Sequence, residues 1–65
     1  MKLGELLDKI ADSVNVRLFV LNTDLMLNGS KDSVNCMLNK ETLNMEVKEV
    51  DCDVTGYLRI FVEEE

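Results

Sequence analysis

Apolar residues near the start of the chain recur with the spacing of an amphipathic helix. The spacing is i, i+3, i+4, i+7 and i+11, and the residues concerned are Leu3, Leu6, Leu7, Ile10 and Val14. Charged side chains occupy the opposite side of this predicted helix. We therefore expect a helix that begins near Leu3 and ends at Asp12-Ser13.

Apolar residues then recur at every second position, which predicts a strand from Val14 to Leu21. One face of this strand carries Val14, Val16, Leu18 and Val20, and the other carries Asn15, Arg17, Phe19 and Leu21. The turn-forming residues Asn22-Thr23-Asp24 then predict a hairpin. Its returning strand spans Leu25 to Asn28 and is expected to be broken by Gly29.

A second helix is predicted next, capped by Ser30 or Asp32 and ended at Asn39-Lys40. Its apolar stripe consists of Val34, Met37 and Leu38.

A long strand from Thr42 to Val54 is also predicted, and its apolar pattern changes parity. The first apolar set is Leu43, Met45 and Val47, and the second is Val50, Cys52 and Val54. One inserted residue near Lys48-Glu49 would let both sets face the core, so we expect a β-bulge or sharp bend there. Thr55-Gly56 forms the tip of the hairpin. The last strand, Tyr57 to Val62, directs Leu58, Ile60 and Val62 inward.

These elements predict a single α+β domain over residues 1–65, in the order α-β-β-α-β-β. Hairpins imply antiparallel pairing, so we expect a four-stranded antiparallel sheet with two helices packed on one face. A chain of 65 residues buries only a small core. We therefore expect it to be marginally stable alone or completed by self-association as a homo-oligomer, most simply a dimer.

Composition excludes several classes of function. The chain contains no His, the commonest acid–base side chain near neutral pH and the commonest zinc ligand. Its serines and cysteines have no recognisable activating base, so we expect a protein that is not an enzyme and has no cofactor or metal. The net charge of −6 argues against direct binding to nucleic acid or to an anionic membrane. It suits a partner protein with a basic surface, and solubility alone would explain the acidic charge equally well.

The cellular location is inferred from the cysteines and from hydropathy. Cys36 and Cys52 form no CxxC motif, and we expect them to be reduced and mostly buried. No apolar run approaches the roughly 20 residues of a membrane span. These features favour a reducing, intracellular location.

The outward face of the predicted sheet carries all the aromatic residues of the chain, which are Phe19, Tyr57 and Phe61. Arg17 and Arg59 flank them. Exposed aromatic and Arg side chains together are typical of binding surfaces, which would hold a second copy, a target protein or a flat ligand. Alternatively, the two helices sandwich the sheet, and Phe19 and Phe61 belong to the core.

Acidic residues form two groups, Glu46, Glu49, Asp51 and Asp53 on one strand and Glu63 to Glu65 at the end of the next. Cross-strand or successive carboxylates, about 6–7 Å apart, imitate the phosphate spacing of nucleic acid. Such a row would fit a basic groove. The more common origin of such a row is a solvated face and a charged sheet edge that prevents aggregation.

The opening Met1-Lys2-Leu3-x-Glu5-Leu6-Leu7-x-x-Ile10, which leads into a Val-x-Val strand, resembles small proteins encoded by phages and prophages of Gram-positive bacteria. The likeness extends to Gly29 before a short helix with Leu38, and to the ending Leu58-Arg59-Ile60-Phe61-Val62-Glu63. It implies a host-directed protein of the bacterial cytoplasm that inhibits an enzyme or defence system by occupying a site.

The resulting expectation is a non-enzymatic inhibitor that occupies the basic site of a bacterial protein, such as a defence nuclease. Two alternatives stay open. One is a self-assembling binder that sequesters a nucleotide-like anion through Arg17 and Arg59, with Tyr57 or Phe19 stacked on a base. The other is a structural domain whose only activity is to form an oligomer.

Overall fold

The structure contains both predicted hairpins, and they meet along their inner strands. It is a computed structural model that describes residues 1–64. The elements in chain order are α1 (Leu3–Leu7), β1 (Asn15–Val20), β2 (Met26–Ser30), α2 (Lys31–Met37), α3 (Lys40–Leu43), β3 (Glu46–Cys52) and β4 (Leu58–Glu63). The α+β class and the order of the two hairpins are as predicted.

The sheet is mixed, which corrects the prediction of a purely antiparallel sheet. Its order is β2-β1-β4-β3, with antiparallel pairing inside each hairpin and parallel pairing between β1 and β4. Alternation and turn residues determine the pairing within a hairpin, because the turn brings its own two strands together. They contain no information on how one hairpin lies against the other. That arrangement depends on the path of the helical connection from β2 to β3.

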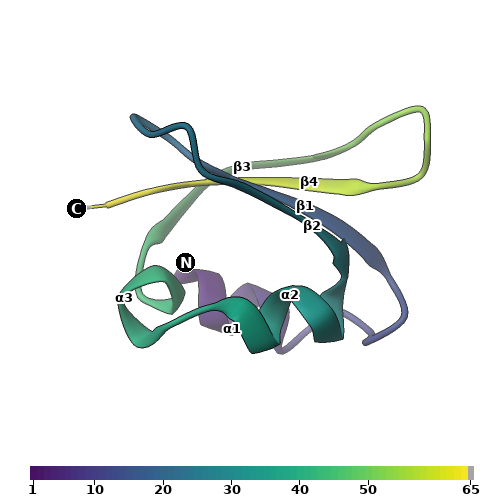
Figure 1. Cartoon of the computed structure of the whole chain (residues 1–65), viewed down its shortest axis with the longest axis horizontal. Coiled ribbons are helices and arrows are strands. Elements are labelled where there is room, and N and C mark those ends of the chain that lie inside the picture. The colour runs from purple at the N-terminus through teal and green to yellow at the C-terminus, as the bar shows by residue number, and fades with distance from the viewer. Residues whose placement is uncertain (65) are drawn as a thin grey trace.

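The three helices lie on one face of the sheet (Figure 1). The core fills the space between the two layers, and its buried apolar side chains are Leu3, Leu7, Val16, Leu18, Val20, Val34, Ile60 and Val62. The inward faces predicted for β1 and β4 are therefore confirmed. The opposite face of the sheet has no helix over it among residues 1–64.

Helix ends differ from the predicted ones. The first helix is shorter than expected and ends at Leu7. Ser30 is the N-cap of α2, where its Oγ accepts a hydrogen bond from the backbone N–H of Ser33, so this predicted cap is confirmed. A third helix, α3, extends into the start of the strand predicted from Thr42 to Val54, and β3 begins only at Glu46 and ends at Cys52. The N-cap of α3, Asn39, accepts a hydrogen bond of 2.9 Å from the backbone N–H of Thr42.

The predicted β-bulge is confirmed, because the register between β3 and β4 shifts between Val47 and Glu49. The prediction that the bulge lets both apolar sets of this strand reach the core is wrong, because the apolar residues beyond the bulge do not join the core. Val50 is 41% exposed, and Cys52 and Val54 are also exposed. The hairpin tip extends past the end of the helical layer (Figure 1), where Val54 is fully exposed, and Val50 lies on the edge strand β3. Cys36 is also free and exposed, which contradicts the prediction of buried cysteines.

Candidate functional site

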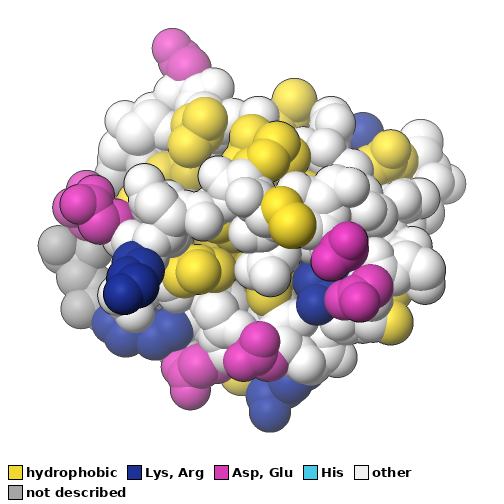
Figure 2. Space-filling model, turned by 60° about the horizontal axis from the view of Figure 1, so that its bottom comes forward, with side chains coloured by type: hydrophobic (Ala, Val, Ile, Leu, Met, Phe, Trp, Pro, Cys, Tyr) yellow, Lys and Arg dark blue, Asp and Glu magenta, His cyan; other side chains and the backbone are white. Residues whose placement is uncertain are grey.

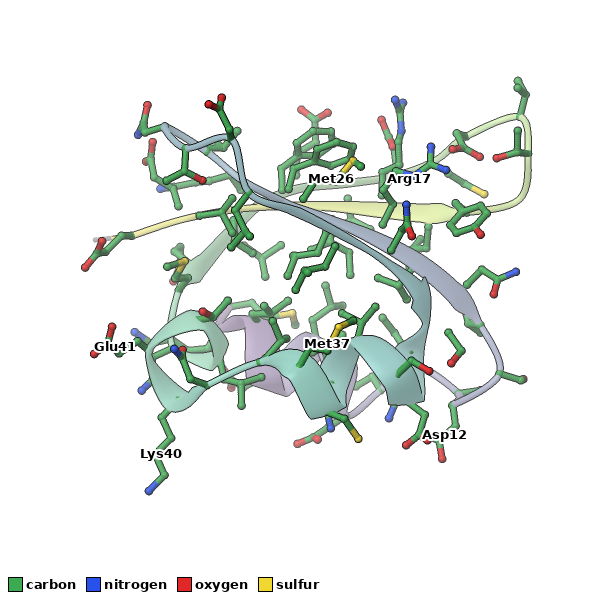
Figure 3. All side chains as sticks on the ribbon, in the orientation of Figure 1. Asp12, Arg17, Met26, Met37, Lys40 and Glu41 are labelled. Carbon is green, nitrogen blue, oxygen red and sulfur yellow. The ribbon has the colours of Figure 1, made fainter. Side chains whose placement is uncertain are left out.

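The uncovered face of the sheet gathers most of the residues that the sequence singles out. We call it the open face and define it by the residues Arg17, Phe19, Met26, Asn28, Glu49, Asp51, Asp53, Tyr57, Arg59 and Phe61. Arg17 and Met26 both point away from the helices (Figure 3). The other members follow from strand alternation and from the register of the three strand pairs.

The register arranges the open face in rows that cross all four strands. One row, from β2 to β3, consists of Met26, Phe19, Phe61 and Glu49. The next row consists of Asn28, Arg17, Arg59 and Asp51. The first row is therefore apolar over three strands and ends in a carboxylate, whereas the second is polar and charged throughout.

Phe19 and Phe61 stack on each other at the centre of the open face. Their ring centroids are 4.9 Å apart, and the ring planes are inclined by 10°. Both residues are half-buried, with no helix over them among residues 1–64. The alternative in which helices sandwich the sheet and enclose these rings is therefore not the arrangement observed. Their outer surface is available for contact with another molecule.

Arg17 is held between an aromatic ring and a carboxylate. Its guanidinium carbon lies 4.5 Å from the centroid of the Tyr57 ring, a cation–π geometry. Its Nη1 donates to Oδ2 of Asp53 at 3.3 Å. Its Nε is buried and has no hydrogen-bond partner among residues 1–64. The side chain is therefore fixed in position although one of its donors is unsatisfied.

Arg59 is engaged more completely than Arg17. Its Nε and Nη2 donate to the two carboxylate oxygens of Asp51, at 2.7 and 2.8 Å. This hydrogen-bonded contact with Asp51 is the main cause that raises the pKa of Arg59 above its ordinary value. Both arginines of the predicted site therefore already bind a carboxylate of the same chain.

Asp53 organises the tip of the β3–β4 hairpin. Its Oδ1 accepts hydrogen bonds from the Thr55 hydroxyl at 2.6 Å, the Thr55 N–H at 2.9 Å and the Tyr57 N–H at 3.1 Å. The Thr55 hydroxyl, then the two backbone N–H groups and the charge of Arg17, hold the pKa of Asp53 below its ordinary value. Asp53 thereby fixes the backbone just before Tyr57 and supports the contact between Tyr57 and Arg17.

The predicted acidic residues do not form one continuous row. Glu46 binds the α-amino group of Met1 at 2.8 Å, and this hydrogen bond is the main cause that lowers the pKa of Glu46. Glu63 accepts a hydrogen bond of 3.1 Å from Asn22 and lies 3.9 Å from Nζ of Lys48. Glu49 is exposed beside the aromatic pair. Glu65 lies outside the described residues.

Sequence reasoning missed the contribution of β2 to this face. Met26 lies directly opposite Phe19 in the register and is 47% exposed. A depression of about 450 Å³ opens between the aromatic pair and the β1–β2 turn. Its lining residues are Phe19, Val20, Leu21, Asn22, Thr23, Asp24, Leu25, Met26 and Phe61. A three-residue turn at Asn22-Thr23-Asp24 would have set Leu27 opposite Phe19, whereas the observed connection is one residue longer and sets Met26 there.

The helix side of the molecule carries charged side chains of both signs (Figure 2). Figure 2 shows acidic and basic side chains interspersed there, with hydrophobic side chains between them. Within residues 1–64, no group of three or more Cys, Asp or Glu side chains has the arrangement of a metal site. None of the helices in this part of the chain is long and apolar enough to cross a membrane.

No family model, curated protein or solved structure matches this chain. Function must therefore be inferred from the geometry and charge of the chain itself.

Proposed function

We propose that this chain is a non-enzymatic interaction domain whose open face binds a partner protein with a basic surface. The stacked pair of Phe19 and Phe61 on the uncovered side of the sheet is the observation that carries the proposal. An aromatic centre surrounded by polar and charged groups is the usual anatomy of a protein-binding hot spot. The rows of the open face have this arrangement, with the arginine–aspartate pairs beside the aromatic row.

Charge favours a basic partner. The net charge of −6 attracts a positively charged protein and raises the rate of association at low salt. The exposed carboxylate of Glu49 stands at the end of the aromatic row, so a Lys or Arg of the partner would reach it while an apolar group contacts the rings. If the basic surface is the working site of a bacterial enzyme, binding there would inhibit it. The resemblance to phage proteins implies such a role.

The ion pairs disfavour a nucleotide-like ligand on the same face. An anion would have to displace Asp51 from Arg59 or Asp53 from Arg17, and both contacts are already formed. Replacing a bidentate carboxylate by a phosphate gains little, because the phosphate would add charge to a chain that is already acidic. A protein surface can contact the rings and leave both pairs in place.

Affinity capture from a Gram-positive bacterial lysate tests the proposal. Immobilised wild type is compared with Phe61→Ser, which removes half of the stacked pair, and with Met37→Ser as a matched control. Met37 is an exposed apolar residue on α2, on the helix side of the sheet. Circular dichroism shows that each variant is folded before capture.

The proposal expects a basic protein that wild type and Met37→Ser retain, that Phe61→Ser does not, and that salt releases. A second variant, Glu49→Lys, reverses one charge beside the rings and is expected to weaken capture without changing the fold. Equal retention by Phe61→Ser and wild type, or retention that is constant from low to high salt, would contradict the proposal.

A further inference from the structure

The two edges of the sheet are protected to very different degrees against pairing with a further strand. At the β3 edge, the N-terminal segment pairs with the chain that enters the strand. The N–H of Leu3 donates to the carbonyl of Met45 at 3.0 Å, and the N–H of Val47 donates to the carbonyl of Met1 at 2.9 Å. The bulge and the charged residues Lys48 and Glu49 follow. Covered backbone, a bulge and charge are the devices by which an edge avoids pairing with another strand.

The β2 edge has none of these devices. Residues 25–30 carry no charge, and the strand has no bulge. The N–H of Val20 donates to the carbonyl of Leu25, and the N–H of Lys31 donates to the carbonyl of Val14. In an antiparallel pair, the backbone groups of every second residue form hydrogen bonds to the neighbouring strand and those of the residues between them point away. The N–H and C=O groups of Met26 and Asn28 therefore point outward, away from β1. Two residues with unused strand-pairing groups therefore lie on an apolar, uncharged edge.

We propose that a second copy of this chain pairs antiparallel with β2, about a two-fold axis that passes beside Met26. In this register Met26 faces Met26 of the second copy, and Asn28 faces its Asp24. The row of Phe61, Phe19 and Met26 then continues across the axis into the same row of the other copy. On the helix side, Leu25, which is 48% exposed, lies directly opposite Leu27 of the second copy. Apolar groups thus meet on both faces of the junction.

Charge selects the register, and the absence of charge on β2 permits a second copy of this acidic chain to approach. An axis shifted to Asn28 would set Asp24 against Asp32 of the second copy, which the like charges disfavour. The axis at Met26 avoids that contact. Two acidic chains repel each other, and the one strand edge free of charge is where their approach costs least. A second copy also supplies matching apolar side chains at every central position, because the edge is self-complementary.

The dimer has a consequence for the proposed function. A two-fold axis perpendicular to the sheet keeps the two open faces on the same side, so a dimer offers two aromatic centres to one partner assembly. This consequence depends on the proposed function, whereas the dimer itself does not. The oligomeric state of the purified protein tests the dimer without any partner present.

Sedimentation equilibrium of purified protein, from micromolar to millimolar concentration, is the experiment. Met26→Lys places a charge on the edge, and Asn28→Pro removes an outward N–H that β1 does not use. Val50→Lys is the matched control, because Val50 is an exposed apolar residue on the opposite edge strand. Thermal unfolding of each variant verifies that the chain is folded.

Wild type and Val50→Lys are expected to reach twice the chain mass of 7.4 kDa, and the two β2 variants are expected to stay at the monomer mass. A wild type that is monomeric throughout the range overturns the inference. So does a dimer that both β2 variants retain. A dimer that only Phe61→Ser dissociates would place the second copy on the open face instead.

Discussion

Arg59 on β4 and Asp51 on β3 face each other in the register and share two hydrogen bonds of 2.7 and 2.8 Å. Both side chains are 37% exposed, so water screens their attraction and the geometry of the pair matters more than its charge. The planar fork of Arg matches the two carboxylate oxygens, which the single ammonium of Lys cannot do.

Arg59→Lys is therefore expected to lower the urea midpoint although it conserves charge. Equilibrium unfolding of wild type, Arg59→Lys, Asp51→Asn and the double variant measures the coupling between the two positions. A stabilising coupling free energy between Arg59 and Asp51 that disappears when Lys replaces Arg59 supports the bidentate geometry. Equal midpoints for wild type and Arg59→Lys would show that charge alone is sufficient.

The stacked pair on the open face stabilises the fold as well as offering a binding surface. Phe19→Ala and Phe61→Ala each remove half of the pair, and we expect a coupling free energy of about 1 kcal/mol, typical of stacked aromatic pairs. A double-mutant cycle by urea denaturation measures it. A coupling near zero would mean that the two rings contribute separately, through their burial against neighbouring side chains.

How much of this fold the sequence predicts depends on the range of the interaction. Alternation within one strand gives the inward residues of β1 and β4, and the change of parity near Lys48-Glu49 gives the bulge. These patterns are local, because each follows from the geometry of one strand or one turn. The parallel pairing of β1 with β4 is long-range, and no local pattern encodes it.

The same distinction applies to the candidate site. Outward-facing positions are readable from alternation, so the aromatic residues and both arginines are placed on one face by sequence alone. Which carboxylate each arginine binds depends on the relative register of separate strands. Arg17 comes from the first hairpin and Asp53 from the second, and only the three-dimensional arrangement of the hairpins brings them together.

Gly29 lies within β2, one residue before the N-cap of α2, and does not break the strand as predicted; its backbone conformation favours glycine. Its φ of +144° is one that other residues rarely adopt. Gly29→Ala is expected to destabilise the protein by about 1 kcal/mol or more, although the added Cβ would meet only ordinary contacts.

Gly4→Ala is the matched control for that substitution. Gly4 lies within α1, where Ala is favoured by up to about 1 kcal/mol, and its Cβ would lie 3.5 Å from the carbonyl oxygen of Leu43. Thermal unfolding is expected to show opposite signs for the two variants. Equal destabilisation would point to crowding at both positions instead of backbone conformation at Gly29.

The hairpin tip should make stability depend on acid pH through Asp53. Hydrogen bonds from Thr55 and the Tyr57 N–H hold the folded pKa of Asp53 below its ordinary value of 3.8. Its contribution to stability is therefore complete above the unfolded pKa and is lost as the pH falls through the lower folded pKa.

The variant Asp53→Ala lacks this contribution at every pH. The difference in urea midpoint between wild type and Asp53→Ala is thus expected to be largest near neutral pH and to shrink below pH 3.8. Asp24→Ala, which removes an exposed carboxylate from the other turn, is the control for the loss of one surface charge. A difference for Asp53→Ala that persists unchanged at low pH would show that its hydrogen bonds do not require the ionised carboxylate.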